Sequence, residues 1–150
     1  MPDAARYLSA RGRVSFREMA LRFREAGGSP TRILTSPFVR AVQTAEILSE
    51  ALRYDGEIVL DPRLSPGFDV AMLTAVLEDY PGEREIALVG HEPDLGGVLT
   101  RLLSLPGRYA MRKGDIAALD LPTPGNPLRA GLAWLLTGDR RIEDPSSLPA

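Results

Sequence analysis

Cysteine is absent from this chain of 150 residues, and histidine occurs once, at position 91. Without cysteine, the chain forms neither a disulfide nor a thiolate metal site. A single imidazole also argues against a zinc or non-haem iron centre, because such centres usually take several histidines. We therefore expect that any function of His91 does not depend on a zinc or iron centre.

A strong charge of one sign is also lacking: 18 basic and 20 acidic residues give a formal net charge of −2. Nucleic-acid or anionic-membrane binding would need a basic excess. No apolar run approaches the length that spans a bilayer, and the start, MPDAARYLSARGR, lacks the apolar core of a signal peptide. We therefore expect a cytoplasmic protein of one domain, residues 1–150, with no nucleic-acid or membrane partner.

Apolar periodicity and turn residues predict helices that alternate with strands. The predicted helices cover 9–26, 36–52, 69–80 and 93–105, and the predicted strands cover 32–36, 57–60, 85–90, 116–121 and 132–136. A loop is predicted over 61–68, a turn over 122–127 and an irregular tail over 137–150. The alternation indicates an α/β fold, a three-layer αβα sandwich with a mostly parallel central sheet.

The segment SPFVRAVQTAE, residues 36–46, is the first candidate anion-binding corner. Ser36 is predicted to cap a helix and Pro37 to occupy its first position, which leaves free backbone N–H groups. Arg40 opposes the helix dipole there unless it holds a bound anion in its guanidinium fork. From this segment alone, an exposed arginine on a helix face is the simpler interpretation.

His91 marks a second corner, because it directly follows the apolar strand EIALVG, 85–90, and precedes a predicted helix. Ligands of open α/β sheets bind outside the carboxyl ends of the strands. If the strands are parallel, both corners lie on one edge and favour a shared phosphate pocket over a capping or surface histidine. Weaker candidates for an acid lie in or beside the predicted strand-exit loops: Asp61, Asp69, Glu92 and Asp94.

Four segments resemble the histidine phosphatase superfamily, specifically its SixA branch of phosphohistidine phosphatases. They are LSARG (8–12), ILTSPFVRAVQTAEIL (33–48), LSPGFDVAMLTAVL (64–77) and ALVGHEPDLGGVL (87–99). The resemblance runs in order over about residues 6–136, and the pair S-P-x-x-R-A-x-Q-T-A-E and V-G-H-x-P is jointly specific.

The resemblance implies a role for each matching residue. Arg40 would bind the phosphoryl group, and His91 would contact it and stabilise the charge of the transition state. Ser36 and Gln43 would shape the same pocket. The family needs no metal and no cofactor, and its SixA branch acts on phosphohistidine-containing proteins.

One departure from the family is large. The family opens with an interior β-strand that ends in Arg-His-Gly, whose histidine is the nucleophile, whereas this chain has no histidine before His91. The absence of this interior strand should expose backbone groups on the strands that flank it, and an oligomer would be one way to cover them. Three explanations of the missing strand are possible: the start codon was assigned too late, the chain was shortened on purpose, or the protein is a true shortened relative. The first two are favoured, because the other motifs of the family are intact.

The sequence therefore predicts a SixA-like protein phosphohistidine phosphatase in a full-length form, with this chain inactive or truncated. Two alternatives remain: a catalytically dead module that binds phosphate or phosphoproteins, and a phosphatase of small phosphate esters.

Overall fold

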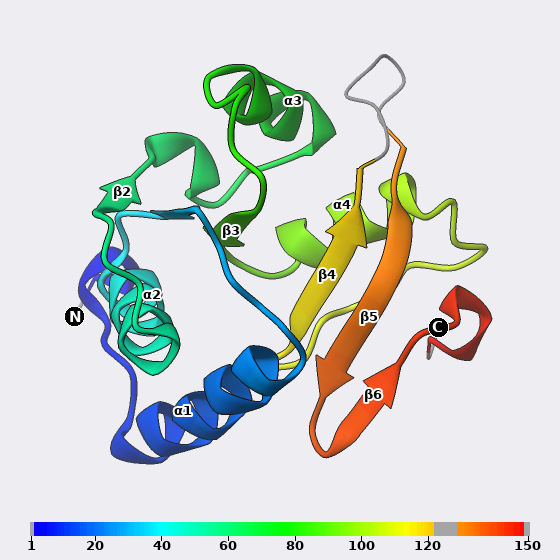
Figure 1. Cartoon of the computed structure of the whole chain (residues 1–150). Coiled ribbons are helices and arrows are strands. Elements are labelled where there is room, and N and C mark those ends of the chain that lie inside the picture. The colour runs from blue at the N-terminus through cyan, green and yellow to red at the C-terminus, as the bar shows by residue number, and fades with distance from the viewer. Residues whose placement is uncertain (1, 122–128, 149–150) are drawn as a thin grey trace. The chain divides into compact units, whose positions relative to one another are not determined.

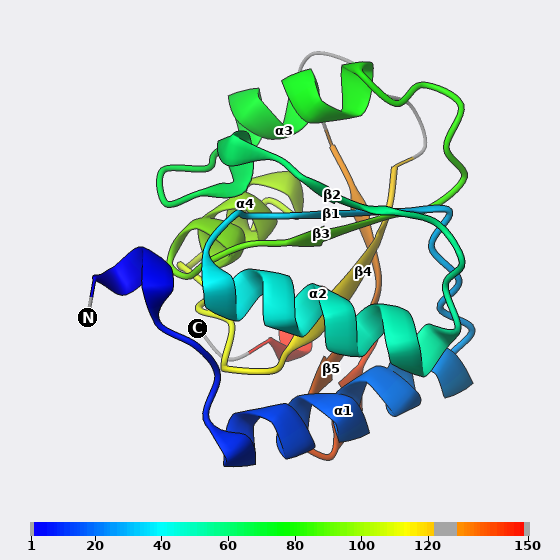
Figure 2. The same cartoon turned by 90° about the vertical axis from the view of Figure 1, so that its left-hand side faces the viewer.

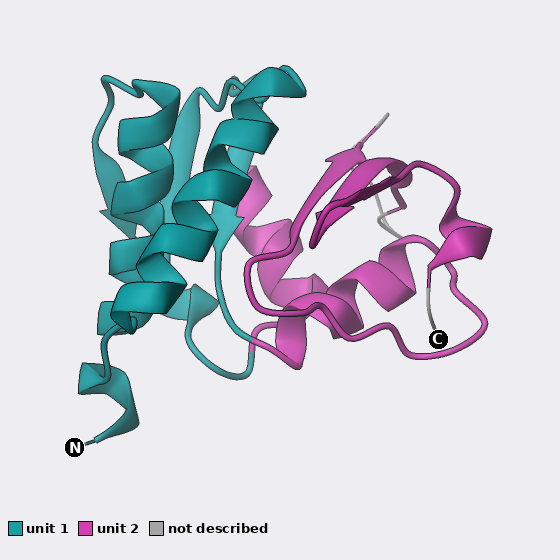
Figure 3. Ribbon diagram, turned by 90° about the horizontal axis from the view of Figure 1, so that it is seen from below, with its two compact units in different colours: residues 1–67, 82–91 teal, residues 68–81, 92–150 magenta. Residues whose placement is uncertain are grey.

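The computed structural model describes residues 2–121 and 129–148. Figure 1 follows the chain through its helices and strands, and Figure 3 colours the two compact units into which it divides. Unit 1 holds residues 1–67 and 82–91, and unit 2 holds residues 68–81 and 92–150. Each unit is built from two separate stretches of chain. The predicted α/β class is confirmed.

Unit 1 contains a parallel sheet in the order β2-β1-β3. Its strands are β1 Arg32–Thr35, β2 Ile58–Leu60 and β3 Ile86–Val89. In β1, Thr35 pairs with Leu60 on one side and with Val89 on the other. The three strands thus end side by side, which brings their carboxyl-terminal loops to one edge of the sheet.

Two helices complete unit 1: α1, Ala10–Glu25, and α2, Val39–Leu52. α2 packs against the sheet and α1 packs against α2, as Figure 2 shows. The buried positions recur at helical spacing and are filled by Phe16, Met19, Ala20 and Phe23 in α1 and by Ala41, Ala45, Leu48 and Ala51 in α2. The small alanine side chains allow the two helices to approach closely.

The predicted start and end of the first helix are confirmed. Ser9 caps α1 by accepting a hydrogen bond from the Gly12 backbone N–H at 3.0 Å. Ala26 follows the last helical residue, and Gly27 then adopts a φ of 95°, a conformation that favours glycine.

Unit 2 contains α3, Val70–Glu78, and α4, Asp94–Leu102, with an antiparallel sheet in the order β4-β5-β6. Its strands are β4 Ile116–Asp120, β5 Gly131–Thr137 and β6 Arg140–Ile142. Leu99, Tyr109, Leu135 and Ile142 form its core. The parallel pairing predicted for the chain is thus found in unit 1. The turn predicted over 122–127 lies outside the described residues.

The prediction of an irregular tail was wrong in part, because β6 lies within it and a short 3₁₀ helix, Pro145–Ser147, follows. Thr137 pairs with Arg140, so Gly138 and Asp139 form a two-residue hairpin turn. Gly138 supplies the positive φ, 56°, that such a turn requires. A second 3₁₀ helix, Pro62–Leu64, occupies part of the predicted loop over 61–68. No helix among the described residues is long and apolar enough to cross a membrane.

Candidate functional site

Ser36 and His91 meet where two neighbouring parallel strands end. Ser36 directly follows β1 and His91 lies two residues beyond β3, and the Ser36 N–H donates to the Val89 carbonyl at 2.9 Å. The His91 Nε2 atom is 2.8 Å from Ser36 Oγ. Ser36 is fully buried and His91 is 8% exposed. The two corners singled out in the sequence therefore lie at the same edge of the sheet.

Arg40, the second residue of α2, reaches the same place. Its Nη2 atom is 3.5 Å from His91 Nδ1. Because a guanidinium only donates hydrogen bonds, this pairing assigns the acceptor role to Nδ1 and the proton to Nε2. Nε2–H then donates to Ser36 Oγ. The hydroxyl of Ser36 both donates and accepts, so it is able to hold either tautomer of His91.

Phe38 supports both members of this pair. Its ring centroid lies 4.8 Å from that of His91, with the rings tilted by 59°, and the Arg40 guanidinium carbon lies 5.2 Å from the Phe38 centroid. The second distance is that of a cation–π contact. Phe38 stands between Ser36 and Arg40 in the segment SPFVRAVQTAE, but no sequence pattern indicated its role.

The predicted start of the second helix was wrong. Phe38, and not Ser36, is the N-cap of α2, and the helix begins at Val39 and not at Pro37. Ser36 Oγ accepts from the Phe38 N–H at 3.2 Å and contacts His91, so it closes a turn before the helix. Among the residues that the structure describes, the N–H groups of Val39 and Arg40 have no acceptor. They are suited to an anion at the start of α2.

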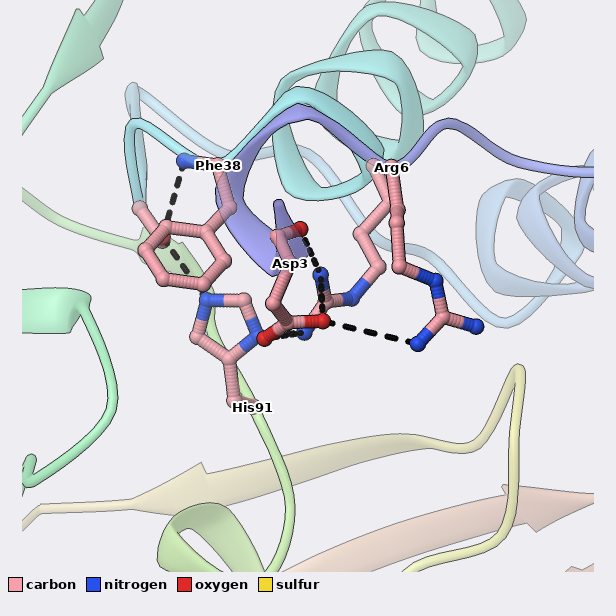
Figure 4. A network of polar contacts seen from close by, with 6 residues as sticks. Asp3, Arg6, Phe38 and His91 are labelled. Carbon is pink, nitrogen blue, oxygen red and sulfur yellow. Dashed lines mark hydrogen bonds and ion pairs between the residues drawn. The ribbon is translucent and has the colours of Figure 1, made fainter. Parts of the chain in front are cut away.

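A carboxylate lies in the fork of Arg40. Asp3, in the 3₁₀ helix η1 (Asp3–Ala5), places Oδ1 3.1 Å from Nη1 and Oδ2 3.3 Å from Nη2 of Arg40. Arg40 Nη1 also donates to the Asp3 carbonyl at 2.9 Å, and Arg6 Nη1 lies 3.5 Å from Oδ1 (Figure 4). Nothing in the sequence pattern indicated Asp3, because its partner lies 37 positions away.

Gln43 lies one helical turn after Arg40 and binds the same N-terminal segment. Its Oε1 accepts from the Leu8 backbone N–H at 2.7 Å. This bond ties the segment before α1 to α2. The phosphate contact that the family resemblance implies for Gln43 stays a prediction.

The weaker acid candidates have structural partners. Asp61 forms a two-pronged ion pair with Arg63, with 2.7 Å between Oδ2 and Nη2, and this bond lowers the pKa of the Asp61 carboxyl. Asp69 is the N-cap of α3, and Asp94 is the first residue of α4. Glu92 accepts from the N–H groups of Gly96 and Met111, and burial raises its pKa. Over 2–121 and 129–148, no three His, Cys, Asp or Glu side chains gather as metal ligands would.

Comparison with known proteins agrees with this arrangement. The family model of the histidine phosphatase superfamily (branch 1) matches residues 3–65, a range that includes Asp3, Ser36, Arg40 and Gln43. A solved structure of the protein histidine phosphatase SixA complexed with tungstate superposes with a TM-score of 0.79 and 25% identity. That match covers 91% of this chain and 86% of the SixA chain. Residues 3–65 thus match the histidine phosphatase superfamily, and the superposition on SixA confirms the predicted histidine phosphatase-like fold.

Two curated proteins are similar to this chain in sequence. It is 28% identical over 126 residues to the phosphohistidine phosphatase SixA of Escherichia coli, covering 83% of this chain and 78% of that protein. It is 36% identical over 100 residues to an uncharacterized protein of Picosynechococcus sp., covering 63% of this chain. That alignment spans 58% of the Picosynechococcus protein.

Proposed function

We propose that Arg40, His91 and Ser36 bind a phosphoryl group, with Gln43 at the border of the pocket. We further propose that a form carrying the family's nucleophilic histidine is a SixA-like protein phosphohistidine phosphatase. The observation that carries the proposal is the carboxylate of Asp3 in the Arg40 fork, beside His91. A carboxylate offers two oxygens to a guanidinium as a phosphoryl group does.

The geometry supports binding and charge neutralisation. A phosphoryl group in the place of the Asp3 carboxylate would accept two hydrogen bonds from Arg40 and lie beside His91 Nδ1. His91 would donate to it once its proton moves to Nδ1, and the Ser36 hydroxyl would then donate to Nε2. Donors held in advance around the non-bridging oxygens stabilise the charge of a phosphoryl-transfer transition state.

The nucleophile of the family reaction is the missing part. In that reaction a histidine attacks phosphorus and the leaving group departs, and water then hydrolyses the phosphohistidine intermediate. The sequence holds one histidine, His91, whose ring nitrogens face Ser36 and Arg40. We therefore expect this chain to bind phosphate without turning it over.

A phosphohistidine substrate is consistent with the lack of an acidic side chain that could protonate a leaving group at residues 64–68. Ester hydrolysis usually needs an acid to protonate an alkoxide leaving group, whereas imidazole leaves more readily. Residues 64–68 contain no acidic side chain, and the nearby Asp61 has a lowered pKa that favours the ionised form. A protein bearing phosphohistidine is therefore the proposed substrate ahead of a small phosphate ester.

Titration calorimetry with inorganic phosphate tests the binding step. Arg40→Ala should weaken the binding by at least about tenfold, and Arg11→Ala, which removes an exposed arginine from α1, should leave it unchanged. An Arg40→Ala variant that binds phosphate as tightly as the parent chain would refute the proposed pocket.

One other function follows from a specific observation: a single histidine suits a module that binds phosphorylated proteins without catalysis. Reading the in-frame codons upstream of Met1 discriminates the two. A strand followed by Arg-His-Gly supports the enzyme, and its absence supports the binding module. Where the motif is encoded, the longer protein should hydrolyse phosphohistidine peptides faster than simple alkyl phosphate esters, and the reverse order would favour a small-ester phosphatase.

A further inference from the structure

We propose that Asp3 is an internal competitor for the anion pocket, so that a phosphoryl ligand binds Arg40 only by displacing the Asp3 carboxylate. The inference rests on the proposed phosphate site. Both Asp3 carboxylate oxygens lie within 3.3 Å of separate Arg40 nitrogens, which is the two-pronged geometry that a phosphoryl group would need. One guanidinium edge cannot serve both anions at once.

The two arginines around the Asp3 carboxylate favour its replacement by a phosphoryl group. Arg6 Nη1 lies 3.5 Å from Asp3 Oδ1, and Arg40 Nη1 lies 3.1 Å from the same oxygen. A ligand that replaces the carboxylate therefore meets two guanidinium groups and no remaining carboxylate between them. A phosphoryl group carries more negative charge than a carboxylate, so it gains more from that pair.

Displacement of the carboxylate needs little rearrangement. The Asp3 side chain is 56% exposed, so water solvates the carboxylate when it swings away. Two contacts of the segment do not use this carboxylate: Arg40 Nη1 donates to the Asp3 carbonyl, and Leu8 N–H donates to Gln43 Oε1. The segment thus has contacts that hold it against α2 while the Asp3 side chain is exchanged for a ligand.

Substitutions of Asp3 distinguish the effect of its negative charge from the effect of packing the N-terminal segment against α2. Asp3→Asn removes the negative charge and keeps the side-chain size and the backbone carbonyl. Asp3→Ala removes the side chain altogether. Asp55→Asn is the matched control, because Asp55 is an exposed aspartate in the loop after α2 and its loss changes the net charge equally. Arg40→Ala reports whether the pocket itself exists.

The experiment is titration calorimetry of the four variants and the parent chain with inorganic phosphate and, separately, with tungstate. Asp3→Asn and Asp3→Ala should tighten the binding of both oxyanions by about fivefold, the upper range for an exposed ion pair, while Asp55→Asn changes it less than about twofold. Circular dichroism melting curves confirm that each variant is folded.

The outcomes are distinct. If Arg40→Ala weakens phosphate binding but neither Asp3 variant tightens it, the competitor role of Asp3 is refuted and the phosphate pocket stands. Equal tightening by Asp3→Asn and Asp55→Asn also refutes it, because the effect is then one of net charge. If neither the parent nor any variant binds either oxyanion, the proposed pocket fails and the role of Asp3 fails with it.

Discussion

Arg40 Nη2 lies 3.5 Å from His91 Nδ1, although 51 positions separate the two residues in the sequence. The parallel pairing of β1 with β3 explains the distance, because α2 starts just beyond β1 and His91 lies just beyond β3. Phe38 then packs on both side chains. A guanidinium and an imidazole are thus held together by a short stretch of sheet.

Arg40→Ala should weaken phosphate binding by roughly ten- to a hundredfold, because hydrogen bonds to charged groups contribute about 1.5–3 kcal/mol. Arg40→Lys should give an intermediate loss, since lysine keeps the charge but not the planar fork. Calorimetric dissociation constants measure both. Equal affinities for the lysine variant and the parent chain would show that charge alone, without the fork, binds the ligand.

Ser36→Ala should destabilise the fold and weaken phosphate binding together. The substitution leaves the Phe38 N–H and buried His91 Nε2 without their Oγ partner, which costs about 1–3 kcal/mol in the free energy of unfolding. Urea unfolding measures that loss, and the ¹⁵N shifts of His91 report its tautomer. Ser49→Ala, a half-buried serine of α2, is the control. ¹⁵N shifts that place the proton on Nδ1 in the parent chain would contradict the tautomer assignment, and a Ser36→Ala stability equal to that of Ser49→Ala would contradict the predicted loss.

The regular elements of unit 1 could be predicted from sequence because local patterns dictate them. The spacing of Phe16, Met19, Ala20 and Phe23 gave the buried face of α1, and Ser9 gave its start. Short apolar runs gave the parallel strands, and the strand ends gave the edge where Ser36 and His91 meet.

Where prediction failed, a distant partner decided the outcome. Ser36 carries the local pattern of a helix cap, but its oxygen is used by His91, 55 positions away. Asp3 carries no pattern at all, and its place follows from Arg40, which lies 37 positions further along the chain. Such contacts depend on the folded arrangement and have no signal within one segment.

Gly28→Ala should destabilise unit 1 by about 1–3 kcal/mol, the usual cost of overpacking. A Cβ at Gly28 would overlap the ring of Phe23, a buried residue of α1. Gly82→Ala is the matched control, because its Cβ would meet no atom within 4 Å. Midpoints of urea unfolding compare the two variants. A Gly28→Ala midpoint equal to that of Gly82→Ala would mean that the Phe23 ring moves aside at no cost.

Asp61→Asn should destabilise the fold in a way that depends on pH. Asp61 is 6% exposed and is bound by the Arg63 guanidinium, whose hydrogen bonds lower the pKa of the carboxyl below 3.8. A lowered folded-state pKa stabilises the protein above the unfolded value, and this contribution disappears as the pH falls through the folded-state pKa.

The Asp61→Asn variant should therefore lose about 1–3 kcal/mol in the free energy of unfolding at pH 7 and at pH 5, the range for hydrogen bonds to charged groups, and progressively less below about pH 3.8. Urea unfolding over this pH range measures the difference, with Asp55→Asn as the exposed control. A penalty that stays constant down to pH 3 would show that Asp61 acts through packing and capping of the 3₁₀ helix and not through its charge.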